Sequence, residues 1–121
     1  GIMSELYRIC APNAQVVIKV PHPRHDDFIN DPTHVRPVTP EMLALFDLEL
    51  NREWQQKGGA NSKLAMALGV DFSIEQVAIV PEKVYQEKLD AGELTLQQIA
   101  NIARKDLNVI RETIILLRAR K

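Results

Sequence analysis

The sequence has few of the residues that mark several protein classes. Cysteine occurs once, at Cys10, so the chain cannot form an internal disulfide, and this usage suits a reducing, cytoplasmic compartment. No apolar run approaches the ~20 residues that a membrane-spanning helix needs. The N-terminus also lacks the pattern of a secretory signal peptide. We therefore expect a cytoplasmic protein without a membrane partner.

Aromatic residues are also scarce, at 5% of the chain, so the core must be built from Leu, Ile, Val and Ala. The 121 residues include 45% hydrophobic and 26% charged side chains, which is ordinary globular usage. This length suits one domain with a modest core. Gly1 and Ile2 precede Met3 and resemble a cloning remnant, so we expect a single domain over residues 3–121.

Net charge is close to zero, at -1, which argues against a grip on nucleic acid or membrane by the whole surface. The C-terminal end is different, because residues 104–121 hold six basic and two acidic side chains. Basic residues near a helix C-terminus interact favourably with the helix dipole. They therefore indicate either a stabilised helix end or a binding site for a polyanion. The candidate nucleic-acid residues are Arg104, Lys105, Asn108, Arg111 and Arg118.

The first part of the chain predicts a β-hairpin. Residues 6–10 (LYRIC) and 15–20 (QVVIKV) are rich in strand-forming residues, and the Ala11–Ala14 segment between them contains Pro and Asn. Two short strands around such a turn are typical of a hairpin.

The middle of the chain predicts helices. Thr39 is a suitable N-cap with Pro40 at the first helical position, and Gly58-Gly59 ends the helix. Shorter helices are expected over residues 61–68 and 81–89. Residues 71–80 fit either state, because Ser73 starts a capping box while the later β-branched residues favour a strand. We favour the strand.

Residues 95–121 carry the strongest pattern. Apolar side chains recur at helical spacing, at Ile99, Ala103, Leu107, Ile110, Ile114 and Leu117. No Gly or Pro interrupts residues 103–109, so one continuous helix from about residue 96 to 119 is favoured over a helical hairpin.

The same segment also resembles part of a DNA-binding motif. Thr95 as a cap, followed by Gln97-Gln98-Ile99-Ala100, resembles the first helix of the helix-turn-helix family over about 20 residues. The resemblance implies a dimeric DNA-binding regulator with its motif at residues 95–118. The sequence departs from the family pattern at Arg104 and Lys105, where a small residue and an apolar residue are expected.

Four consecutive apolar residues, at positions 114–117, cover all sides of one helical turn. Such a turn belongs either in the core or at a subunit interface. The candidate interface residues are Leu107, Ile110, Ile114 and Leu117.

All three histidines lie in a Pro- and Asp-rich loop that we expect over residues 21–39. Imidazole and carboxylate groups bind Zn, Mn or Fe, which makes His22, His25, Asp26 and His34 candidate metal ligands. A solvated loop with turn-capping side chains is the favoured alternative, because a Pro-broken loop is a poor metal scaffold.

No nucleophile elbow, P-loop or dinucleotide fingerprint occurs, so we expect neither an enzyme nor a cofactor. The expected fold is α+β and predominantly helical, with a small N-terminal β-hairpin followed by four to five helices. The expected function is a non-enzymatic interaction module that uses its C-terminal helix to form a homo-oligomer, such as a homodimer, or to bind a protein partner. The alternatives are the DNA-binding regulator and a metal-dependent enzyme on the His/Asp loop.

Overall fold

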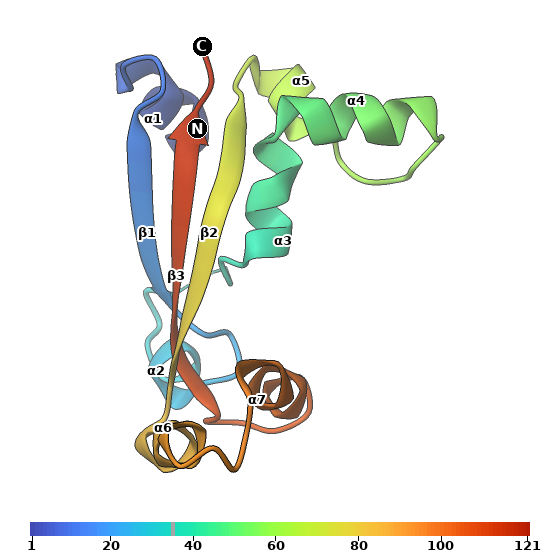
Figure 1. Cartoon of the computed structure of the whole chain (residues 1–121). Helices are drawn as coiled ribbons and strands as arrows, with labels where there is room; N and C mark the ends of the chain where they lie inside the picture. The colour runs from blue at the N-terminus through green and yellow to red at the C-terminus, as the bar shows by residue number, and fades with distance from the viewer. Residues whose placement is uncertain (35) are drawn as a thin grey trace. The chain divides into compact units, whose positions relative to one another are not determined.

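The fold was obtained as a computed structural model that describes residues 1–34 and 36–121. Its helices are α1 (Ile2–Ile9), α2 (Asp26–Ile29), α3 (Pro40–Leu43), α4 (Leu48–Gln56), α5 (Leu64–Leu68), α6 (Lys83–Asp90) and α7 (Leu96–Ala103), with a 3-10 turn η1 (Ala44–Phe46). The strands are β1 (Gln15–Pro21), β2 (Phe72–Pro81) and β3 (Ile110–Ala119). They form an antiparallel sheet in the order β1-β3-β2, and Figure 1 shows β3 between its two neighbours. Among the residues that the structure describes, none of the helices has the length and apolar character needed to span a membrane.

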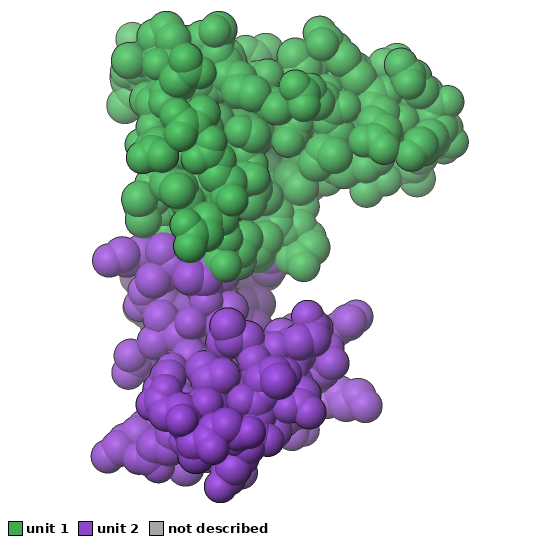
Figure 2. Space-filling view, viewed as in Figure 1, with its two compact units in different colours: residues 1–18, 40–77, 115–121 green, residues 19–39, 78–114 purple. Residues whose placement is uncertain are grey.

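The chain divides into two compact units, which Figure 2 colours separately. Unit 1 comprises residues 1–18, 40–77 and 115–121, and unit 2 comprises residues 19–39 and 78–114. Unit 1 has a core that includes Leu43, Phe46, Ala65, Val70, Phe72, Ile115 and Leu117. In unit 2 the core is centred on Ile99, Ala103, Val109 and Ile110.

The predicted N-terminal hairpin is wrong. Residues 2–9 form α1, and Met3, Leu6, Tyr7 and Cys10 are half-buried at helical spacing. The Tyr7 ring packs edge-on against Phe72, with ring centroids 5.3 Å apart. The partner of β1 is therefore β3, almost a hundred positions later, rather than a neighbouring strand.

The predicted C-terminal helix is also wrong, both as one helix and as a helical hairpin. Only its first part is helical, as α7, and residues 110–119 form the central strand of the sheet. α7 ends at Ala103 with Arg104 as its C-cap, and Asn108, in the connection before β3, adopts a left-handed φ of 58°, a conformation that Asn tolerates better than most side chains. The second helix of the helix-turn-helix pattern is therefore absent.

The apolar residues of β3 follow a strand pattern that coexists with the helical one. Thr113, Ile115, Leu117 and Ala119 are buried in alternation with half-buried neighbours, as expected for a central strand. The run of β-branched residues at 113–115 favours a strand as well.

The helix predicted from Pro40 to the Gly58-Gly59 pair is interrupted. Asp47 has extended backbone angles, and its carboxylate accepts a hydrogen bond from the Leu50 amide, so that it caps α4. The strand preferred for residues 71–80 is confirmed as β2, and the cap at Thr95 is confirmed with a full capping box to Gln98.

Candidate functional site

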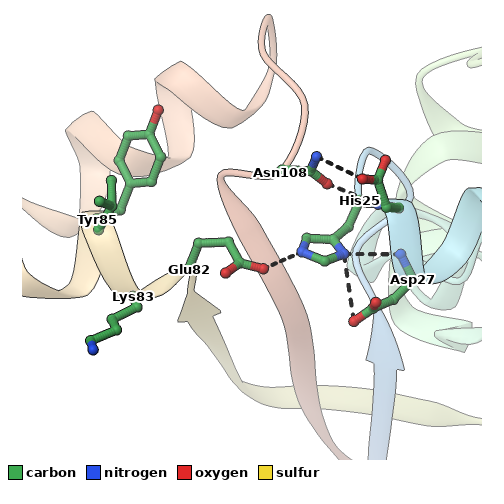
Figure 3. Close-up of a pocket in the computed structure, with 8 residues that line it drawn as sticks. His25, Asp27, Glu82, Lys83, Tyr85 and Asn108 are labelled. Carbon is green, nitrogen blue, oxygen red and sulfur yellow. Dashed lines mark hydrogen bonds and ion pairs between the residues drawn. The ribbon is translucent and has the colours of Figure 1, made fainter.

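A polar pocket of about 530 Å³ lies in unit 2, lined in part by His25, Asp26, Asp27, Glu82, Tyr85 and Asn108. Figure 3 shows that these side chains come from the start of α2, the end of β2 with the start of α6, and the connection before β3. The pocket thus joins segments that are far apart in the sequence.

His25 is the buried centre of this pocket, with only 6% of the residue exposed. Its Nε2 contacts the Glu82 carboxylate. Its Nδ1 accepts a hydrogen bond of 3.0 Å from the Asp27 amide, and this bond caps the N-terminus of α2. Because Nδ1 is an acceptor, the proton of the neutral ring is on Nε2 and is donated to Glu82.

This arrangement makes His25 a structural residue in the form observed. A general base needs a free lone pair that faces the substrate, and both ring nitrogens of His25 already have partners. Glu82 orients the ring much as a carboxylate orients a catalytic imidazole, but the ring here faces the backbone of α2.

Asn108 closes the other side of the pocket against Asp26. Its Oδ1 accepts a bond of 2.9 Å from the Asp26 amide, and its Nδ2 donates one of 3.0 Å to the Asp26 carboxylate. The Asn108 amide also donates to the carbonyl oxygen of Arg24. Asn108 therefore holds α2 to the connection between α7 and β3, which is a structural use for a residue named as a nucleic-acid candidate.

The other two histidines have different partners from His25 and from each other. His22 Nδ1 accepts a bond from the Arg24 amide, and the His34 ring stacks on Phe28 with centroids 5.6 Å apart. Among the residues that the structure describes, no three His, Cys, Asp or Glu side chains are grouped to hold a metal ion. The candidate ligands His22, His25, Asp26 and His34 therefore form no common centre here.

A second feature lies in unit 1, on the side of the sheet opposite its buried residues. The Ala119 amide bonds to the Ala14 oxygen, and the Arg120 amide bonds to the Asp71 oxygen. This antiparallel register places Val17 of β1 and Glu75 of β2 on either side of Leu116. We call this surface the open face; its residues are Gln15, Val17, Glu75, Val77, Leu116 and Arg118.

The open face is apolar in the middle and polar at one end. Val17 is 58% exposed and Val77 is 43% exposed, and Leu116 is half-buried between their strands. Arg118 forms an ion pair with Glu75 and also donates to the Asn13 oxygen at 2.8 Å. Hydrogen bonding from Arg118 lowers the pKa of the Glu75 carboxyl.

The candidate interface residues differ in burial, because residues 110–119 form a strand and not a helix. Ile110 and Leu117 are buried, Ile114 is half-buried, and Leu107 is 59% exposed in the connection before β3. Sequence reasoning missed Val17 and Val77. Their signal is a run of consecutive apolar residues, at positions 16–18 and 77–80, because such a run in a strand places apolar side chains on both faces of the sheet.

The basic residues that were candidates for nucleic-acid binding lie on two segments, the connection after α7 and the strand β3. Arg104 and Lys105 are exposed just after α7, and Arg111 is exposed at the start of β3. Arg118 is occupied by Glu75 on the open face.

No protein family, curated protein or solved structure proved significantly similar to this chain.

Proposed function

We propose that this protein is a non-catalytic interaction module that pairs with a second copy of itself through the open face. The observation that carries the proposal is the exposure of Val17 and Val77 on strands that flank Leu116. Sheets commonly bury such faces by packing against a second sheet about 10 Å away. Pairing of two open faces would remove these side chains from water.

The charges on the open face favour a second copy over a strongly charged partner. The face holds one acidic and one basic side chain, Glu75 and Arg118, and they neutralise each other. A two-fold axis brings identical surfaces together, so a surface with a single sign of charge would repel its copy. The net charge of -1 adds little repulsion between whole chains.

Light scattering of three variants tests this proposal. Val17→Lys and Val77→Lys each place a charge in the middle of the open face and are expected to convert a dimer into a folded monomer. Val84→Lys is the matched control, because Val84 lies in unit 2 and is exposed to the same 58% as Val17. It is expected to leave the dimer intact.

Circular dichroism of each variant confirms that it is folded. A wild-type protein that stays monomeric at high concentration would contradict the proposal. A Val17→Lys variant that dimerises as strongly as wild type would contradict it equally.

A further inference from the structure

The buried ring of His25 has a consequence that is independent of dimerisation. The bond from the Asp27 amide requires an unprotonated Nδ1. If Nδ1 takes up a proton, two N–H groups face each other across 3.0 Å, and this cap of α2 is lost. The helix is only four residues long, Asp26–Ile29, so one cap is a large share of its stabilisation.

A replacement partner for a protonated ring is already in place. The Asp27 carboxylate Oδ2 lies 3.5 Å from Nδ1, beyond a good hydrogen bond but within reach of a small movement. On the opposite side of the ring, the Glu82 carboxylate contacts Nε2. A charged His25 would therefore lie between two carboxylates.

The surrounding groups agree with this arrangement. Besides His25, the titratable and charged side chains that line the pocket are Asp26 and Asp27 of α2, Glu82 between β2 and α6, and Lys83 and Tyr85 of α6. In Figure 3 the Lys83 side chain is directed away from the ring, and the Asp26 carboxylate is bonded to Asn108. The preceding connection adds His22, whose carbonyl oxygen accepts from the His25 amide, and the exposed Arg24.

We propose that His25 is an acid-sensitive cap of α2. On acidification, Nδ1 binds one proton from solvent, the Asp27 amide is released, and the ring forms an ion pair with the Asp27 carboxylate. The N-terminus of α2 opens, and the pocket beside it changes shape.

Amide hydrogen exchange of the full chain tests the proposal at residue resolution. Protection factors are compared at about pH 8 and about pH 5, the interval in which histidine side chains change charge. Protection of the Asp27 amide is expected to fall by about fivefold, as expected for the loss of one helix cap. Unchanged protection of this amide across the interval would overturn the proposal.

Two variants separate the cap from general acid effects. His25→Asn keeps a capping oxygen that cannot be protonated in this interval, so the protection of the Asp27 amide is expected to become independent of pH. His34→Gln removes a histidine that contacts α2 without capping it, through the Asp27 carbonyl oxygen and the Phe28 ring, and is expected to keep the wild-type pH response. A His25→Asn protein with the wild-type response would overturn the proposal.

Nitrogen NMR of the wild-type ring supplies a test that does not depend on a variant. At the alkaline end the His25 shifts are expected to report a proton on Nε2 alone. Protonation of Nδ1 and loss of Asp27 protection should then share one midpoint. Protonation of the ring with the Asp27 amide still protected would overturn the proposal, and so would loss of protection without protonation of the ring.

Discussion

Asn108 binds Asp26 twice, accepting from its amide at 2.9 Å and donating to its carboxylate at 3.0 Å. It does so from a left-handed backbone conformation with a φ of 58°. From the connection between α7 and β3, this residue thus anchors α2, which lies more than 80 positions earlier in the chain.

The first prediction separates the hydrogen bonds of Asn108 from its backbone conformation. Asn108→Gly keeps the backbone conformation but loses the bonds to Asp26, and we expect it to lower the free energy of unfolding by about 1 kcal/mol. Asn108→Ala loses the bonds and strains the backbone as well, for a loss of about 2–3 kcal/mol. Urea unfolding measures both. Equal losses in the two variants would show that the backbone conformation is not a source of strain.

The second prediction concerns Arg120 at the end of the chain. Its guanidinium bonds to the carboxylates of Asp71 and Asp47, whose side chains are mostly buried. These bonds, against the cost of burying the guanidinium, raise the pKa of Arg120. Arg120→Met would leave two carboxylates without their cation, and we expect it to cost about 3 kcal/mol in the free energy of unfolding.

A matched control for Arg120 is available on the open face. The ion pair of Arg118 with Glu75 is more exposed, so Arg118→Met is expected to cost less than about 1 kcal/mol. Guanidinium denaturation would screen these charges, so urea unfolding at fixed ionic strength is the suitable measurement. Similar losses for both variants would contradict this ranking.

The third prediction concerns Asn51, a fully buried amide in α4. Its Nδ2 donates to the carbonyl oxygens of Leu45 and Asp47, and its Oδ1 accepts from the Met66 amide. Asn51→Leu has a similar size but removes the side-chain partner of the Leu45 oxygen and of the Met66 amide, whereas the Asp47 oxygen keeps its bond from the backbone amide of residue 51. Thermal unfolding is expected to show a loss of about 3 kcal/mol.

The exposed Asn61 is the control for this substitution, and Asn61→Leu is expected to change stability by less than about 0.5 kcal/mol. If Asn51→Leu were as stable as wild type, the bonds that join α4 to α5 would not contribute to the fold as described.

The fourth prediction is a loss of stability at alkaline pH that depends on Tyr7. Burial, and then the Asp71 carboxylate, raise the pKa of the Tyr7 phenol, whose hydroxyl donates to the Arg120 oxygen. A raised pKa means that the folded state prefers the neutral phenol. The resulting stability is fully present below the ordinary phenol range and is lost as pH rises through the folded-state pKa.

Tyr7→Phe tests this linkage, because the variant has no phenol to ionise. The free energy of unfolding is measured from about pH 8 to about pH 11, around the ordinary tyrosine range. We expect the variant to be about 1 kcal/mol less stable near neutrality, from the lost hydrogen bond, and to decline less at alkaline pH. Parallel curves for the two proteins would contradict the assignment.

The features that the sequence predicted correctly are local ones. The cap at Thr95 needs only residues 95–98, and Val77, Ile79 and Val80 favour β2 because they are strand formers. Gly69 ends α5 with a φ of 68°, as expected for a glycine after a helix.

The features that it missed depend on distant partners. Residues 110–119 satisfy a helical and a strand pattern at once, and pairing with β1 and β2 decides between them. No Gly or Pro follows the end of α7 at Ala103, so the sequence carries no strong local signal for the end of this helix. His25 is a candidate metal ligand by residue type, but its partner Glu82 lies 57 positions away and no local pattern connects them.

The fifth prediction is the most direct test of the proposed self-association. Methyl NMR with a soluble paramagnetic agent reports how accessible each side chain is to solvent. The methyl groups of Val17, Val77 and Leu116 are expected to broaden in dilute protein and to be shielded in concentrated protein, whereas Val84 should broaden equally in both. Shielding confined to the three open-face residues is the result that we predict. Equal broadening of Val17 and Val84 at every concentration would contradict the proposal.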